Sequence, residues 1–313
     1  MLVRRTDSGW EIHAPAKLNL FLEVVRRRSD GYHDIETLVY PIDLFDTLVF
    51  RRVPGSRIEL TVQWASHQAY SAPDMLGHVP ADASNLAHRA VEHVRQATGI
   101  SEGLRLDIFK RIPSGAGLGG GSSDAAAALL GACLTWGLNH DLLPLPDWAA
   151  ELGSDVPAFL QAGPCVCRGR GECVTAVSGI GHWHAVLVRP RFGLSTAEVY
   201  RACRPPQRPR SVEDCLHALA QGERGRLADT LFNRLQEPAE RLAPRLIDLQ
   251  RRLELQGAWA ARMTGSGSCC FGLFPHRASA WAAARRLQAD PDFAAVFVVQ
   301  GYSQCSRRKG GRP

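Results

Sequence analysis

A glycine-rich segment, residues 113–127, holds the residue types best suited to binding an anion. Glycines stand at 115, 117, 119, 120 and 121, and so few Cβ atoms let a ligand lie directly on the backbone N–H groups. Ser122, Ser123 and Asp124, all good helix N-caps, precede an alanine and leucine run that predicts a helix. An alternating segment, residues 104–109, predicts a strand before the loop. A loop between strand and helix N-terminus gathers unpaired N–H groups and a positive dipole end, which favours phosphate.

Two common nucleotide-binding motifs do not describe this loop. Gly115, Gly117 and Gly120 satisfy G-x-G-x-x-G, but no acidic residue ends a second strand about twenty residues later, as a dinucleotide site requires. The loop also lacks the Gly-Lys-Ser/Thr ending of a P-loop. A glycine-rich surface turn is the simplest alternative. The order Pro-x-x-x-Gly-Leu-Gly-x-x-Ser-Ser-x-Ala-Ala over residues 113–126 argues against it.

A lysine and an aspartate far apart in the sequence are the candidates for acid–base chemistry. Residues 10–25 alternate as a strand, which places Lys17 and Asn19 on one face. Asp155 precedes Pro157, which suits the first turn of a helix, so Asp155 is expected at or near its N-cap. Such a cap alone is worth about 1 kcal/mol. A helix N-terminus and a nearby lysine would also keep the carboxylate ionised, as a general base requires.

Two further positions have both a structural and a functional reading. Asp30-Gly31 is a turn dipeptide, and the Tyr32 and His33 that follow offer a flat apolar face and edge hydrogen bonds to a nucleobase. Taken alone, they are ordinary turn residues. Asn85 stands where the N-cap of a helix belongs, because an apolar stripe follows it and Gly99 marks the stop.

The loop resembles the phosphate loop of the galactokinase, homoserine kinase, mevalonate kinase and phosphomevalonate kinase superfamily. Three other segments, Pro-Ala-Lys-Leu-Asn from residue 15, Asp-Gly-Tyr-His from residue 30 and Leu-Gly-Ser-Asp-Val-Pro from residue 152, carry the resemblance further. The first two are similar to one family within it, the 4-diphosphocytidyl-2-C-methyl-D-erythritol kinases of the non-mevalonate isoprenoid pathway. The resemblance extends from Pro15 to about residue 300. It implies an enzyme that uses ATP and Mg²⁺ to phosphorylate the 2-hydroxyl of that cytidyl acceptor.

The resemblance also implies roles for individual residues. Lys17 and Asp155 would be catalytic. Residues matching the family's nucleotide contacts are Pro113, Ser114, Gly115, Ala116, Gly117, Leu118, Gly119, Gly120, Gly121, Ser122, Ser123, Asn85 and Lys110, and those matching its acceptor contacts are Asn19, Tyr32, His33, Thr196 and Tyr200. In the family the histidine hydrogen-bonds the cytosine, an aromatic residue stacks on the base, and the threonine lies near the reacting hydroxyl. No protein ligand for a metal is assigned.

The fold class that follows is α+β, in two domains. Strands are expected at 184–188, 259–263, 269–274 and 294–300, with helices at 244–255 and 278–287, and this β-α-β-β-α-β order is the ferredoxin-like split motif. Residues 164–313 would form this ferredoxin-like domain and contribute to the substrate site. The resemblance implies a ribosomal protein S5 domain 2-like domain for residues 1–163, with the ATP site and the catalytic residues. The turn at residues 264–268 would close against the phosphate loop.

Composition sets the remaining limits. With 313 residues, 45% of them hydrophobic and 22% charged, the chain is long enough for two cores. The apolar run at 125–138 is too short to span a bilayer, and the start lacks the apolar region of a signal peptide, so a cytoplasmic protein is expected. Nine cysteines without regular spacing suit reduced thiols. Cys165, Cys167 and Cys173 lack the number and spacing of zinc ligands, and a hairpin turning at Gly169 and Gly171 explains them better.

The net charge of +6 leaves the partner open, because nucleic acid, a membrane surface and small anions all attract basic proteins. The basic residues are scattered, except in the tail at residues 307–312, which is expected to be a disordered end. We expect the partner to be a small molecule and expect no binding to nucleic acid or to a membrane. We expect the protein to be a monomer or a homodimer. Two alternatives stay open: another small-molecule kinase of the superfamily, and a nucleic-acid-binding protein of related N-terminal fold.

Overall fold

The computed structural model describes residues 1–65, 76–178, 183–222 and 224–302, so the basic tail lies outside the described residues. A large sheet forms one half, with the strand order β1-β2-β3-β5-β4. Three more strands join this sheet beside the main order: β6 pairs with β3 and with β7, and β9 pairs with β2. Its strands are β1 (Leu2–Thr6), β2 (Gly9–Arg27), β3 (His33–Val53), β4 (Ile58–Trp64), β5 (Gly103–Lys110), β6 (Cys165–Gly169), β7 (Cys173–Ala176) and β9 (Phe232–Asn233).

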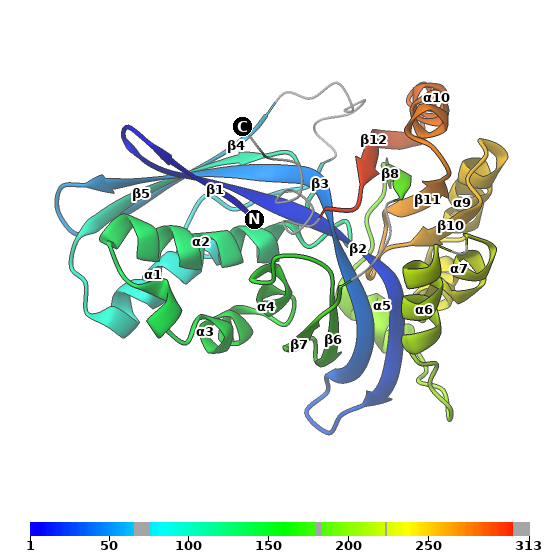
Figure 1. Ribbon diagram of the computed structural model, residues 1–313, viewed down its shortest axis with the longest axis horizontal. Coiled ribbons are helices and arrows are strands. Elements are labelled where there is room, and N and C mark those ends of the chain that lie inside the picture. The colour runs from blue at the N-terminus through cyan, green and yellow to red at the C-terminus, as the bar shows by residue number, and fades with distance from the viewer. Residues whose placement is uncertain (66–75, 179–182, 223, 303–313) are drawn as a thin grey trace.

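Helices cover one face of this sheet (Figure 1). They are α1 (Leu86–Thr98), α2 (Gly120–Trp136), α3 (Leu145–Leu152), α4 (Val156–Phe159) and the short 3₁₀ turn η2 (His140–Leu142). The N-cap of α1 is Asn85, whose side chain accepts a hydrogen bond from the Ala87 N–H, and Gly99 follows in the left-handed region with φ +70°. Both ends of this helix are therefore confirmed.

Helix α2 begins earlier than predicted. Its N-cap is Gly119, in the left-handed conformation with φ 69°, and not Ser122, Ser123 or Asp124, which lie inside the helix. Glycine reaches this conformation without the steric cost that a serine would meet, so the cap sits at the end of the glycine run. The serines and the aspartate thus project from the start of α2 instead of capping it.

Gly131 of α2 makes a tight contact that leads to a prediction. A Cβ at this position would lie 2.4 Å from Phe50 Cζ of β3, and Phe50 is fully buried. We expect Gly131→Ala to lower the free energy of unfolding by about 1–3 kcal/mol, because overpacking outweighs the gain in helix propensity. Gly225→Ala is the matched control, since a Cβ there meets nothing within 4 Å, and it should raise stability slightly. Urea unfolding of both variants measures the difference, and a stabilised Gly131→Ala would contradict the packing argument.

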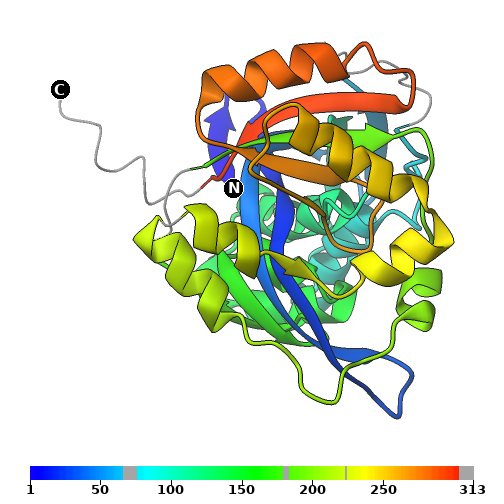
Figure 2. The same ribbon diagram turned by 90° about the vertical axis from the view of Figure 1, so that its right-hand side faces the viewer.

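The second half is a four-stranded antiparallel sheet in the order β10-β11-β8-β12. Two helices cover its outer face (Figure 2), and this arrangement confirms the β-α-β-β-α-β expectation. Four shorter helices join β8 to this core. The bounds are β8 (His184–Pro190), α5 (Thr196–Ala202), α6 (Glu213–Gln221), α7 (Arg224–Thr230), α8 (Gln236–Leu242), α9 (Arg245–Leu255), β10 (Ala260–Met263), β11 (Cys270–Phe274), α10 (Arg277–Leu287) and β12 (Phe293–Gln300).

The predicted boundary at residue 163 falls before the chain leaves the large sheet. Strand β6 pairs antiparallel with β3 and with β7, so Cys165–Gly169 and Cys173–Ala176 form the expected hairpin but belong to the first sheet. The first strand of the second sheet is β8, which begins at His184. Pairing with a distant strand decides this, and the local sequence carries no sign of it.

The long strands β2 and β3 connect the two halves. Their inner residues, among them Leu18 and Tyr40, share a buried core with Leu187 of β8 and Phe271 of β11. Glu23 of β2 is fully buried and accepts two hydrogen bonds from Arg234, at 2.7 and 2.8 Å. The halves therefore meet across both an apolar core and a paired charge. In the described ranges, no helix is long and apolar enough to cross a membrane.

Candidate active site

A cavity of about 1050 Å³ lies where the phosphate loop, the second half of β2, the tip of the β2–β3 hairpin and α5 converge. Most of the residues singled out in the sequence line it, although they come from distant segments. They are Lys17, Asn19, Tyr32, His33, Asn85, Lys110, residues 113–122, Asp155, Thr196 and Tyr200. Ser123 is the exception, because its side chain is buried inside the start of α2 and does not line the cavity.

The phosphate loop packs backbone to backbone against the turn between β10 and β11. A Cβ on Gly117 would stand 2.2 Å from the Thr264 carbonyl oxygen, and one on Gly265 would stand 2.9 Å from the Gly117 carbonyl oxygen. Gly117 has φ +77° and Gly265 has φ +57°, which also favour glycine. The Cys269 N–H donates to the Ala116 carbonyl at 3.4 Å. The expected closure of residues 264–268 on the loop is therefore present, and it leaves no room for side chains between them.

Lys17 lies between this turn and the loop. Its backbone N–H donates to the Leu118 carbonyl at 3.0 Å, and its Nζ is 3.2 Å from the place where a Cβ on Gly265 would be. Its side chain is buried, and the Nζ donates a hydrogen bond to Asn19 Oδ1. The buried surroundings lower the pKa of Lys17, while the charge of Asp155 raises it. The lysine and the aspartate thus act on one another electrostatically, as the sequence reading anticipated.

Asp155 is exposed to the cavity and has a carboxylate that caps nothing. It is the N-cap residue of α4 by position, but its side chain makes no capping hydrogen bond. Its backbone is helical, with φ −85° and ψ −13°, instead of the extended conformation of most N-caps. The purely structural reading of Asp155 is therefore wrong. The carboxylate is available to a ligand that occupies the cavity.

Aromatic side chains gather at another part of the cavity. The His33 and Tyr200 rings lie 5.3 Å apart, and Arg170 of the β6–β7 turn lies 5.3 Å from the Tyr32 ring centroid. Tyr32 is 56% exposed, so its ring is open to a stacking partner. Burial and then the charge of Arg27 lower the pKa of His33, so its imidazole is neutral at pH 7 and can both donate and accept hydrogen bonds.

The hairpin that carries Tyr32 and His33 is fixed by ion pairs between neighbouring arginines and aspartates. Arg28 pairs with Asp30 and with Asp34 at 3.0 Å each, and Arg26 pairs with Asp34 at 2.5 Å. The Tyr32 N–H donates to Asp30 Oδ1 at 3.0 Å, as in an Asx turn. The arginine-rich strand end at residues 26–28 therefore shapes this turn.

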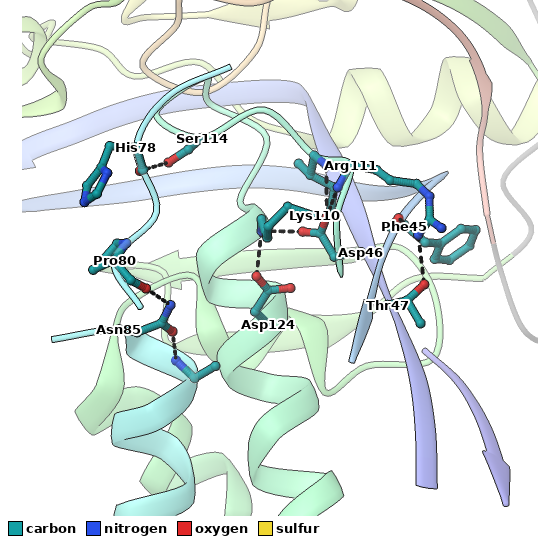
Figure 3. A network of polar contacts seen from close by, with 12 residues as sticks. Phe45, Asp46, Thr47, His78, Pro80, Asn85, Lys110, Arg111, Ser114 and Asp124 are labelled. Atoms are coloured by element: carbon teal, nitrogen blue, oxygen red, sulfur yellow. Dashed lines mark hydrogen bonds and ion pairs between the residues drawn. The ribbon is translucent and has the colours of Figure 1, made fainter. Parts of the chain in front are cut away.

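Lys110 does not hold a free ammonium toward the cavity, although it lines it. Its Nζ lies between two buried carboxylates, donating to Asp46 Oδ2 and, at 2.6 Å, to Asp124 Oδ2 (Figure 3). Asp46 Oδ1 also accepts the N–H groups of Arg111 and Ile112 at 2.5 and 2.9 Å. These two bonds use two of the three N–H donors of the ammonium, and direct contact between it and a nucleotide stays a prediction.

Three other predicted contacts have partners within the protein. Asn85 caps α1 and donates to the Pro80 carbonyl at 2.7 Å (Figure 3). Asn19 holds Lys17 through Oδ1 and donates from Nδ2 to Thr37 Oγ1 at 2.8 Å, so it orients the lysine. Thr196 Oγ1 lies 2.7 Å from Ser266 Oγ, which joins α5 to the closing turn. Each still lines the cavity, and their contacts with ligands stay predictions.

Several contacts that complete the site were not predicted from the sequence, although the closing turn that contains Thr264 was. Thr264 Oγ1 accepts the Asn19 N–H at 3.0 Å, and Asn233 Nδ2 donates to the carbonyls of Met263 and Gly265 at 2.9 and 2.8 Å. These bonds hold the closing turn against β2. Asp46 and Asp124 were missed as partners of Lys110. An acidic residue among the apolar residues of a strand, as at Asp46, is a sequence signal that could have pointed to a buried partner for Lys110.

Comparison with known proteins places the chain among small-molecule kinases. It matches the family described as GHMP kinases N terminal domain over residues 85–163 and that described as GHMP kinases C terminal over residues 215–291. A 4-diphosphocytidyl-2-C-methyl-D-erythritol kinase of Pelotomaculum thermopropionicum is 38% identical over 262 residues, which cover 83% of this chain and 87% of the relative. The kinase of the same name from Rhodopirellula baltica is 38% identical over 312 residues, covering 91% and 93%.

Solved structures agree with the fold. The crystal structure of a 4-(cytidine 5'-diphospho)-2C-methyl-D-erythritol kinase is 36% identical and superposes with a TM-score of 0.76, over 94% of this chain and 100% of the other. The L. major mevalonate kinase is 17% identical with a TM-score of 0.73, over 97% and 99%. At that identity the second similarity concerns the fold alone.

Proposed function

The chain belongs to the family of 4-diphosphocytidyl-2-C-methyl-D-erythritol kinases, and on this premise we propose that it transfers a phosphoryl group from ATP to the 2-hydroxyl of that cytidyl acceptor. The enzyme is an ATP-dependent phosphotransferase with an alcohol as acceptor. The observation that carries the proposal is that Lys17, Asp155 and the phosphate loop line one cavity with Tyr32, His33 and Tyr200. The phosphate-donor site and the nucleobase site that we propose thus lie in one cavity.

The loop fits the triphosphate of ATP. Gly115 and Gly121 would each carry a Cβ into open space, and the N-terminus of α2 at Gly119 and Gly120 faces the cavity. Free N–H groups and the helix dipole suit the terminal phosphates there. Mg²⁺, when bound to ATP, would neutralise charge on the transferred group, and no protein ligand for it is proposed.

Within this geometry each catalytic side chain has one task. The Asp155 carboxylate accepts the proton of the acceptor hydroxyl, as a general base does. The Lys17 ammonium stabilises the alkoxide that develops on the acceptor oxygen. Asn19 orients Lys17 by accepting its hydrogen bond. Phosphoryl transfer needs little else than alignment and charge stabilisation, so these groups suffice for the chemistry.

An acceptor survey tests the proposal against its rivals. Purified enzyme would be given labelled ATP with the cytidyl methylerythritol acceptor, with the same acceptor lacking cytosine, with homoserine and with mevalonate. The proposal expects transfer to the first alone. Efficient transfer to homoserine or mevalonate would favour another kinase of the superfamily. Salt-dependent RNA binding without ATP consumption would favour the nucleic-acid-binding alternative.

The nucleobase assignment makes a narrower prediction. We expect His33→Ala to raise the KM for the cytidyl acceptor by roughly 10- to 100-fold, because a lost hydrogen bond to a buried polar group costs about 1–3 kcal/mol. The KM for ATP should hardly change, since His33 lies among the aromatic residues. His217→Ala, in α6 and outside the cavity lining, is the matched control. An equal rise in both KM values would argue against a cytosine contact.

Three further expectations remain predictions about this chain. These are a cytoplasmic location, a monomeric or homodimeric state, and the lack of a nucleic-acid partner. Gel filtration and light scattering of the purified enzyme measure the second.

A further inference from the structure

The phosphate loop is anchored at its base by a buried cluster of three charged side chains, Asp46, Lys110 and Asp124, which we call the loop anchor (Figure 3). Lys110 is the last residue of β5, just before the chain enters the loop, and Asp124 lies in α2, just after the chain leaves it. Lys110 therefore joins the entry and the exit of the loop through one ammonium. Asp46 of the neighbouring β3 adds hydrogen bonds to two N–H groups of the entry.

Close packing makes this link rigid. A Cβ on Gly120 would stand 3.0 Å from Ile112 Cγ2 and 3.4 Å from Lys110 Nζ, so the first residue of α2 rests on the anchor. Lys110 is 2% exposed, Asp46 0% and Asp124 3%. A change in the bonding of Lys110 is thus transmitted to the helix N-terminus, where the proposed phosphates lie.

The charges of the loop anchor do not balance. Two carboxylates face one ammonium, so full ionisation leaves one buried negative charge near a site for a triphosphate. Buried carboxylates that share a site do not both ionise readily. Asp124 Oδ1 has no hydrogen-bond partner among the described residues, whereas both oxygens of Asp46 accept hydrogen bonds. Asp124 Oδ1 is therefore the oxygen with room for a proton.

Among the residues that the structure describes, no other hydrogen-bond donor to the Asp124 carboxyl besides Lys110 is present. Arg111 gives Asp46 its N–H, while its guanidinium donates to Thr47 Oγ1 at 2.9 Å. Burial raises the pKa of Asp124 to about 8, with Lys110 lowering it and Asp46 raising it. The charged or titratable groups on the other elements that pack against α2 are Lys17 of β2, beside Gly119, Asp155 at the start of α4, and His140 and Asp141 of η2 near the far end of α2. Helices α1 and α3 present apolar side chains to α2, namely Ala87, Ala90, Val91, Val94, Leu145, Trp148 and Ala149.

We propose that Asp124 is a positioning residue that holds the phosphate loop through Lys110 in its neutral form, and that ATP binding favours this form, so that any carboxylate that has lost its proton in the free enzyme takes one up from solvent when ATP binds. This inference rests on the proposed nucleotide site. The protonated carboxyl keeps its Oδ2 as an acceptor for Lys110 and removes the unbalanced charge that would repel the phosphates. Above the pH at which the free enzyme loses this proton, ATP should bind more weakly.

Calorimetry of ATP binding, with excess Mg²⁺ and in two buffers of different ionisation enthalpy, tests this directly. If binding raises the pKa of Asp124 above its free-enzyme value of about 8, the wild type takes up a fraction of a proton per ATP at pH 8. Its affinity should therefore fall measurably between pH 7 and pH 9. Asp124→Asn imitates the neutral carboxyl and should lose both effects, while its affinity at pH 7 stays within about threefold of the wild type.

Two more variants separate positioning from a general loss of structure. Asp124→Ala removes the acceptor of Lys110 and should raise the KM for ATP about tenfold with kcat changed less than threefold, a defect that Asp124→Asn rescues. Asp107→Asn is the matched control, because Asp107 is a buried β5 carboxylate paired with Arg51 and Arg105, away from the loop. Its proton uptake, its affinity for ATP and its KM for ATP should match those of the wild type.

The outcomes divide clearly. Proton uptake that persists in Asp124→Asn would overturn the inference, because the proton would then bind elsewhere. An Asp124→Asn variant with a KM for ATP as high as that of Asp124→Ala would also overturn it, because the site would then require a charged Asp124. Equal effects in Asp107→Asn would overturn it as well. A wild type that binds no ATP would instead overturn the nucleotide site, whereas ATP binding without proton uptake refutes the inference and leaves that site intact.

Discussion

Replacing Asp155 by asparagine is expected to lower turnover by roughly 10²–10⁴ while the fold stays intact, because the amide cannot accept the proton of the acceptor hydroxyl. Stability should barely change, since the Asp155 side chain makes no capping hydrogen bond and so contributes little to α4. The experiment compares kcat for the purified variant with the wild type under saturating ATP and acceptor, alongside thermal unfolding of both.

Asp147→Asn is the matched control for this experiment. Asp147 is an exposed aspartate in the first turn of the neighbouring helix α3, outside the cavity lining. Its replacement should leave kcat unchanged and cost a few tenths of a kcal/mol in stability through the helix dipole. Turnover of Asp155→Asn close to that of Asp147→Asn would remove Asp155 from the role of base.

Lys17→Met is expected to reduce kcat by roughly 10²–10³, because it removes a charge-stabilising donor from the site of the developing alkoxide. The same substitution should raise stability at neutral pH. Burial lowers the pKa of Lys17 from its ordinary value of 10.5, so the ammonium costs folding free energy at pH values below its folded-state pKa. That cost shrinks as the pH rises toward 10.5. A variant that is inactive and yet melts at a higher temperature would show stability given up for function.

Thermal unfolding at pH 7 and pH 10 checks the sign of this effect. The stability gain of Lys17→Met over the wild type should be larger at pH 7, and an increase with pH would contradict it. A double variant with Asp155→Asn tests whether the two side chains act as a unit. If they do, the double variant loses little more turnover than the worse single variant, because effects within one catalytic unit are not additive. Fully multiplicative losses would mean that the two act independently.

The local sequence was sufficient for much of the backbone. The alternation around Lys17, the apolar stripe after Asn85 and the order of strands and helices after His184 all predicted the elements that the structure contains. These features repeat over a few residues, and the period of an apolar pattern depends on the backbone conformation alone. The glycines of the loop, such as Gly117, likewise predicted a close approach to the backbone, because a Cβ at such a position would leave no room for it.

Long-range pairing decided the rest of the site. Asp155 reads as a helix cap, and only the fold turns its carboxylate toward Lys17. Lys110 reads as a free cation, and only the pairing of β5 with β3 and its packing on α2 place it between Asp46 and Asp124. The sequence by itself therefore determined which chemical groups the protein has and which strands and helices carry them. The tertiary structure decided which groups are free, because partners distant in the chain compete for each charge, and that competition leaves no local pattern in the sequence.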